Sequence, residues 1–157
     1  MREYQRDKVV NYAFIWWNST NPRFYNYEGL GGDCTNFASQ CIYAGSEIMN
    51  FNRQGGWFYL NPNDKSPSWT GVDFLKNFLL NNRTKGPFAR LCELHEIELG
   101  DLIQIKQATF FNHSLIVTKI SDGEIYVTAH TNNALNKSLK LYFPKEIRCF
   151  KILGVYD

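Results

Sequence analysis

Three patterns are missing from this 157-residue sequence, and each absence argues against a class of protein. The N-terminal stretch MREYQRDKVVNYAFIWWNST begins with charged residues and contains no apolar run long enough for a signal peptide or a membrane span. No cluster of five or more Lys and Arg occurs and the net charge is only +2, which disfavours nucleic acid as a partner. The four cysteines form no C-x-x-C pair, so their spacing suits neither a zinc ribbon nor a disulfide framework. We therefore expect a cytoplasmic protein with free thiols and no membrane span, with release or secretion by another route as the alternative.

Aromatic residues are abundant. Nine Tyr, twelve Phe and four Trp stand in a chain that is otherwise ordinary for a globular protein, with 44% hydrophobic and 20% charged residues. The length fits one domain, residues 1–157, and is sufficient for folding without a metal or disulfide. We expect most of the aromatic side chains in the core and some of them at a ligand surface.

Helical patterns fill the first half of the chain. Apolar residues recur at intervals of three and four from Tyr4 to Trp17, which predicts an amphipathic helix. A second helix is predicted from the N-cap Asp33 to about Ala44, with Gly45 as its C-terminal stop. Residues 46–68 are rich in Asn, Gly and Pro and predict a long loop. A third helix is predicted from about Ser68 to Asn81.

Short β-type runs follow Arg90, with the tripeptide SDG at 121–123 predicting a tight hairpin turn. Helices followed by an antiparallel sheet define an α+β domain, with the N-terminal helices packed on the sheet. The predicted strands are 101–106, 113–120, 124–130, 139–143 and 147–156.

The segment GGDCTNFASQC, residues 31–41, places Cys34 in the first turn of the second predicted helix. Unpaired backbone N–H groups and the helix dipole favour negative charge there, so a thiolate is more accessible. The same N–H groups can stabilise an oxyanion. A small buried cysteine is the alternative interpretation, and the availability of a base decides between the two.

Two histidines are candidates for that base. His113 begins one strand of the SDG hairpin and His130 ends the other, so both are expected at the open end of the hairpin as neighbours. A thiol, a base and a third polar group that orients the imidazole together form the arrangement of a cysteine hydrolase. Asn132 is a second candidate for the orienting residue. His95, between glutamates, is expected to have a solvated or structural role.

The segments GGDCTNFASQC, GDLIQI, NHSLIVTKI and AHTNN together resemble the "Putative amidase domain" family, within the wider group of NlpC/P60-like and CHAP-like cysteine peptidases and amidases of papain-like fold. The resemblance covers most of the chain, to about Leu139. It implies that Cys34 is the nucleophile and His113 the general base, with His130 ranked slightly above Asn132 as the third member. CHAP-like enzymes have an acidic residue where His130 stands, and that acid is absent here.

Peptidoglycan stem peptides and related amides are the substrates that the resemblance implies, with no cofactor. Gly32 allows close backbone approach beside the nucleophile, and Asp33 caps the helix next to it. Trp57 and Trp69 are candidates to line a substrate groove. Gly32, Asp33, Trp57 and Trp69 are therefore the predicted substrate-binding residues.

Three alternatives stay open at this point. The first is an intracellular or toxin-like amidase that acts on a protein or a small amide. The second is a catalytically inactive module that binds a peptide or glycan through its aromatic residues. The third is a zinc site built from Cys34, His113 and His130, which together offer three metal ligands.

Overall fold

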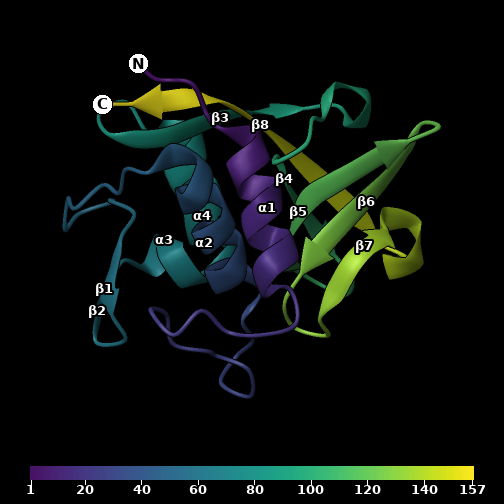
Figure 1. Cartoon of the computed structure of the whole chain (residues 1–157), viewed down its shortest axis with the longest axis horizontal. Helices are drawn as coiled ribbons and strands as arrows, with labels where there is room; N and C mark the ends of the chain where they lie inside the picture. Colours follow the sequence, from purple (N-terminus) through teal and green to yellow (C-terminus); the bar gives the residue numbers. More distant parts are fainter.

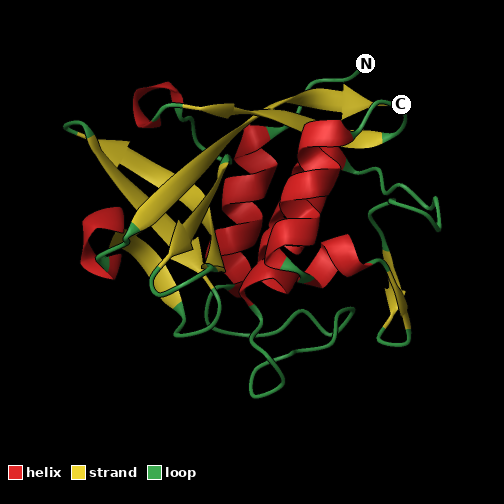
Figure 2. Cartoon of the chain, turned by 180° about the vertical axis from the view of Figure 1, so that it is seen from behind, coloured by secondary structure: helices red, strands yellow, loops and turns green.

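A computed structural model describes all 157 residues and confirms the α+β class. Two long helices, α1 (Arg6–Trp16) and α2 (Cys34–Ser46), lie side by side and pack against a six-stranded antiparallel sheet (Figures 1 and 2). The two chain ends meet at one end of the molecule, where the N-terminal ammonium contacts Asp157 at 3.1 Å. The structure contains no helix with the length and apolar character needed to cross a bilayer.

Helix α2 starts at the predicted position but ends later than predicted. It runs through Gly45 to Ser46, and the chain leaves it at Glu47, which adopts a left-handed backbone with φ of 59°. A Cβ on Gly45 would lie 2.4 Å from Val9 Cγ2 and 2.9 Å from the backbone oxygen of Gln5. Gly45 therefore lets α1 and α2 approach closely, and its role is interhelical packing instead of the predicted helix stop.

The third predicted helix is two helices, α3 (Pro67–Thr70) and α4 (Val72–Asn81), separated by Gly71 in an extended conformation. The long loop before them contains a small hairpin, β1 (Tyr59–Asn61) and β2 (Asp64–Lys65), which stands apart from the main sheet (Figure 1). Helix α4 buries Leu75, Phe78 and Leu79, which lie three and four residues apart as on one face of a helix, whereas Val72 at its start is half-buried.

The main sheet has the strand order β3-β8-β4-β5-β6-β7, and every pair of neighbours is antiparallel. Four predicted strands are present, with small changes at their ends, and β3 and β7 were not predicted. The strands are β3 (Gly86–Cys92), β4 (Leu102–Lys106), β5 (Phe111–Ser121), β6 (Glu124–Ala129), β7 (Ala134–Ser138) and β8 (Glu146–Tyr156).

Both misjudged segments have a physical explanation. Strand β3 contains Gly86 and Pro87, which argue against a strand in general, but it lies at the edge of the sheet, where proline is tolerated. The predicted strand 139–143 is wrong: Leu139–Tyr142 forms the 3₁₀ helix η2, and the strand of this region lies just before it. Leu139 and Tyr142 are buried against the sheet without joining it, whereas Leu141 is exposed.

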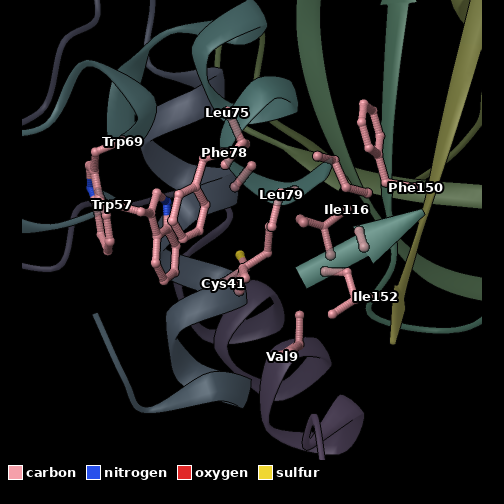
Figure 3. Close-up of a cluster of buried hydrophobic side chains, with 14 of the residues drawn as sticks. Val9, Cys41, Trp57, Trp69, Leu75, Phe78, Leu79, Ile116, Phe150 and Ile152 are labelled. Atoms are coloured by element: carbon pink, nitrogen blue, oxygen red, sulfur yellow. The ribbon is translucent and has the colours of Figure 1, made fainter. Parts of the chain in front are cut away.

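The central strands are buried on both faces. Leu102 and Ile116 belong to the cluster that the helices cover (Figure 3), whereas their neighbours Ile103 and Leu115 belong to a second cluster. Because successive side chains of a strand point to opposite faces, the second cluster lies on the other side of the sheet. Tyr142 of η2 belongs to this second cluster.

Candidate active site

Cys34 is the first residue of α2, and its sulfur lies against β5. The Sγ atom is 3.9 Å from the backbone oxygen of Asn112 and 3.8 Å from the hydroxyl of Thr35. The Thr35 hydroxyl is in turn 2.9 Å from that of Ser114. Asn112 and Ser114 are the two neighbours of His113 in the chain, so the N-terminus of α2 meets the sheet where His113 is located.

Burial controls the protonation of Cys34. The side chain is only 8% exposed, and this desolvation raises the pKa of the thiol above its usual value. Hydrogen bonds from the Ser114 and Thr35 backbone and from the Thr35 side chain oppose the shift without cancelling it. The lowering of the pKa expected from the helix N-terminus is therefore outweighed, and Cys34 is a neutral thiol at neutral pH in the free protein.

His113 is buried and lacks a hydrogen-bond partner at Nδ1. Desolvation, with a smaller contribution from the positive charge of Lys137, lowers the pKa of this imidazole to about 4. His113 is consequently neutral at pH 7 and has the capacity to accept a proton. Its ring contacts the ring of Tyr142, with centroids 5.6 Å apart and an angle of 76° between the planes.

His130 has the opposite environment, because both of its ring nitrogens have partners. Nδ1 lies 2.6 Å from Oδ2 of Asp33, and Nε2 lies 2.7 Å from the backbone oxygen of Trp16. A carbonyl oxygen only accepts hydrogen bonds, so Nε2 carries a proton. The imidazole also stacks on Phe37 with centroids 3.9 Å apart. His130 therefore joins α1, the start of α2 and β6, and it is not hydrogen-bonded to His113.

A change of register explains why the two histidines do not pair. Near the turn, Lys119 pairs with Tyr126, whereas further along Val117 pairs with Val127, so Thr118 is an extra residue on β5. Continuing the second register places His130 opposite Ser114, on the face covered by the helices, and leaves His113 facing the other side. A register kept from the SDG turn without this shift would have put both imidazoles on one face.

The second candidate for orienting His113 is also displaced. Asn132 is exposed in the turn between β6 and β7, where it has a left-handed backbone with φ of 59°. Asparagine tolerates this conformation better than most residues. The structure thus gives Asn132 a turn position and no contact with His113.

Asp33 precedes the nucleophile candidate and is almost completely buried. Its Oδ1 accepts hydrogen bonds of 2.8 Å from the Tyr27 backbone N–H and from Asn36 Nδ2, while Oδ2 faces His130. It occupies the N-cap position, but its side chain does not cap the backbone of α2. The carboxylate instead fixes the preceding loop and His130 to the start of α2.

Gly32 approaches the β6–β7 turn closely. Its φ is +97°, a conformation that favours glycine, and a Cβ there would lie 3.2 Å from the Thr131 hydroxyl. The same hydroxyl accepts a 2.8 Å hydrogen bond from the backbone N–H of Asp33. Gly32 therefore allows the loop before Cys34 to dock on this turn, in addition to any contact with a substrate.

Trp57 and Trp69 require a correction. Both are completely buried in the core cluster, beside the helices and away from the strands of the sheet (Figure 3). The indole of Trp57 donates to the Ser39 hydroxyl, and that of Trp69 donates to Oδ1 of Asn36. Their N–H groups are thus satisfied inside the protein, so they pack α2 and α3 together and do not line a groove.

Three residues of this region were missed in the sequence. Ser114 and Thr35 join α2 to β5, and Tyr142 contacts His113 from η2. Ser114 could have been found from its place beside His113. Tyr142 could not, because its segment was predicted as a strand and only the fold brings it to this site.

The structure gathers no group of three or more His, Cys, Asp and Glu side chains suited to hold a metal ion. The zinc ligands considered above, Cys34, His113 and His130, do not converge, since both nitrogens of His130 already have protein partners. His95 is exposed in the short 3₁₀ helix η1 (Leu94–Glu96), away from these residues in the fold.

Comparison with known proteins agrees with the resemblance seen in the motifs. The model of the family described as "Putative amidase domain" matches residues 3–153. The chain is also 33% identical over 127 residues to "Uncharacterized protein YhbB" of Bacillus subtilis (strain 168). That match covers 78% of this chain and 40% of the relative, so the chain spans less than half of the relative's length. No solved structure matches the chain significantly.

Proposed function

Since this chain belongs to the putative amidase domain family, we propose that it is a cysteine-dependent hydrolase that cleaves amide bonds, with Cys34 as nucleophile and His113 as general base. One observation carries the proposal: the Cys34 sulfur, at a helix N-terminus, contacts the backbone next to a buried histidine that has a free ring nitrogen. A nucleophile, backbone donors and a candidate base thus adjoin the same end of β5, and the proposal requires the His113 imidazole to reach the sulfur when substrate binds.

The reaction would proceed in two stages. As the sulfur attacks the carbonyl carbon, the S–H proton passes to the His113 imidazole, and the negative charge that develops on the carbonyl oxygen is stabilised by the backbone N–H of Cys34. The imidazolium then protonates the leaving amine as the C–N bond breaks, which leaves a thioester on Cys34. Water, deprotonated by His113, hydrolyses the thioester to the carboxylic acid and regenerates the thiol.

The protonation states favour general-base catalysis over a preformed ion pair. Burial raises the pKa of Cys34 and lowers the pKa of His113 to about 4, so both groups are neutral at pH 7 before substrate binds. The proton therefore moves during the attack, and the charge appears only in the transition state.

We assign His130 a positioning role instead of the role of a third member that contacts the base. It holds Asp33, the residue before Cys34, and links it to the last turn of α1. Asn132 has no contact that would support a catalytic role. A helix that presents a cysteine from its N-terminus to an antiparallel sheet with a histidine strand is the arrangement of papain-like NlpC/P60 and CHAP enzymes, and we infer that fold here.

We propose bacterial peptides as the substrate class. Within this class, amide bonds of peptidoglycan stem peptides are the substrate that we favour. The support is the family membership together with the motif resemblance to enzymes of the NlpC/P60 and CHAP groups. An amidase acting on an intracellular protein or a small amide uses the same site and the same steps. The two readings differ only in the groups that flank the scissile bond.

Purified cell wall and synthetic stem-peptide amides test the proposal with wild type, Cys34→Ala and the matched control Cys92→Ser. Cys92 is a half-buried thiol on β3, so its loss should leave cleavage unchanged. We expect new amino groups and carboxylates with wild type and Cys92→Ser, and none with Cys34→Ala. Binding without cleavage by all three proteins would instead identify an inactive binding module.

A further inference from the structure

Tyr142 has a buried hydroxyl group without a partner. The residue ends η2 and is only 8% exposed, yet its Oη makes no hydrogen bond. Burying a hydroxyl in this way costs about 1–3 kcal/mol, so such a group requires an explanation. Packing does not supply one, because a phenylalanine ring would make the same contact with His113 without that cost.

The surroundings of this hydroxyl connect it to the reactive residues. The ring of Tyr142 contacts the ring of His113, whose Nδ1 is likewise buried without a partner. The sulfur of Cys34 lies 3.9 Å from the backbone oxygen of Asn112, the residue before His113, and its charge as a thiolate would raise the pKa of the phenol. Two unsatisfied polar atoms and the thiol thus belong to one region, formed by η2, β5 and the N-terminus of α2.

The electrostatic environment suits a hydrogen-bond donor to an anion. Burial and Cys34 raise the pKa of Tyr142 to about 12, so the phenol keeps its proton at neutral pH. The ammonium group of Lys137 lies 4.1 Å from the centre of the Tyr142 ring. The same positive charge contributes to the lowered pKa of His113. A negative charge that forms at this point is therefore favoured by a nearby cation and by a neutral O–H donor.

We propose that Tyr142 is a catalytic residue whose hydroxyl donates a hydrogen bond to the oxyanion formed when Cys34 attacks an acyl carbonyl. This inference rests on the proposed function and adds a second donor to the Cys34 backbone N–H. The hydroxyl lacks a protein partner in the free protein because its partner is the substrate. No proton is transferred from the phenol, which returns to its original state when the oxyanion collapses.

Two reagents separate an oxyanion role from a packing role without knowledge of the natural substrate. Acylation of Cys34 by p-nitrophenyl acetate passes through a tetrahedral oxyanion, whereas alkylation by iodoacetamide forms no oxyanion. Both rates are measured in a Cys92→Ser background, and the same reactions of Cys34→Ala are subtracted. The variants are Tyr142→Phe and the matched control Tyr126→Phe, whose hydroxyl contacts Glu124 on β6.

We expect Tyr142→Phe to slow acylation about 100-fold, the usual effect of removing one oxyanion donor, and to leave alkylation unchanged. Tyr126→Phe should change neither rate. Equal slowing of acylation and alkylation by Tyr142→Phe would show a structural role and overturn the inference. An unchanged acylation rate would overturn it as well, while Cys34 kept its role as nucleophile.

The two proposals fail in different ways. If Cys34 of the wild type is not acylated at all, the nucleophile assignment fails and this inference fails with it. If Tyr142→Phe does not fold, a fluorotyrosine of lower phenol pKa at position 142 preserves the ring and its packing. Acylation should then fall as the pH passes the pKa of the fluorinated phenol, and an unaltered pH profile would contradict the inference.

Discussion

His113 lies on β5 and His130 directly after β6, the other strand of the same hairpin, and the fold gives them opposite properties. His130 has partners at both nitrogens and a stacked aromatic ring, whereas His113 is buried with Nδ1 unpartnered and its pKa lowered to about 4. The comparison shows that a satisfied imidazole holds structure together, while an unsatisfied one keeps its capacity to bind a proton. The two residues can therefore be separated by mutation.

The largest effect on activity is expected from His113→Ala. Loss of the general base should lower kcat about 10³-fold or more, because a neutral thiol then has no acceptor for its proton. Stability should fall less than in His130→Ala, since the cost of the cavity is partly offset by removal of an unpaired buried nitrogen. Steady-state kinetics together with urea unfolding measure both quantities, and a variant with nearly normal kcat would exclude His113 as the base.

His130→Ala should show the reverse pattern, with stability as the main loss. The substitution leaves the buried Asp33 carboxylate and the Trp16 carbonyl without their partner and removes the stacking on Phe37, so the free energy of unfolding should fall by about 2–4 kcal/mol. Any loss of kcat should be smaller than for His113→Ala. Equal stability of wild type and variant in urea unfolding would contradict the positioning role.

The pH dependence of stability sharpens the comparison further. The pKa of His113 is about 4 in the folded protein and near 6.5 when unfolded, so the unfolded chain binds more protons between these values. The contribution of neutral His113 is complete above pH 6.5 and is lost as the pH falls to 4, by about 3 kcal/mol. Urea unfolding of wild type and His113→Gln across this range isolates the effect, because other groups titrate alike in both. Parallel curves would rule out the lowered pKa.

The same pKa predicts the acid limb of catalysis. The value of kcat/KM reports ionisations of the free enzyme, so activity should rise as His113 loses its proton near pH 4 and should not depend on an ionisation near 6.5. The raised pKa of Cys34 predicts no second rise in activity near pH 8.5, the usual range of a thiol. A limb centred near pH 6.5 would indicate a solvated base.

The smallest effect is expected from Asn132→Ala. The side chain is exposed in the β6–β7 turn and contacts neither histidine, so kcat should remain unchanged. Stability should fall by no more than about 1–2 kcal/mol, the cost of alanine in a left-handed conformation. Asn132→Gly, which adopts that backbone freely, is the matched control. A loss of kcat in both variants would show that the Asn132 side chain contributes to catalysis.

The start of the site could be predicted from the sequence, because local signals define it. The glycines and Asp33 ahead of an apolar periodic run place Cys34 at a helix N-terminus, and the SDG turn brings His113 and His130 to one end of a hairpin. Neither inference depends on distant contacts. The α+β class followed from the same local periodicities.

The remainder depends on tertiary packing that leaves no local trace. The extra residue Thr118 determines which face of the sheet His130 occupies. No turn-forming residue or break in the apolar pattern around Thr118 indicates a bulge at this position. Trp57 lies in a segment with the composition of a loop and Trp69 near the start of the third predicted helix. In the fold, α2 supplies an acceptor for each indole N–H, Ser39 for Trp57 and Asn36 for Trp69, so both rings are buried. Tyr142 reaches His113 only because η2 packs on the sheet instead of joining it.

Trapping the acyl-enzyme tests the central claim most directly. A stem-peptide amide that the protein cleaves is mixed with wild type, quenched in acid during turnover and digested, and the peptide that contains Cys34 is weighed by mass spectrometry. We predict that this peptide carries the acyl group as a thioester, that Cys34→Ala gives neither adduct nor product, and that His113→Ala forms the adduct far more slowly. Cleavage that continues in Cys34→Ala, with no adduct on Cys34 in the wild type, would contradict the account.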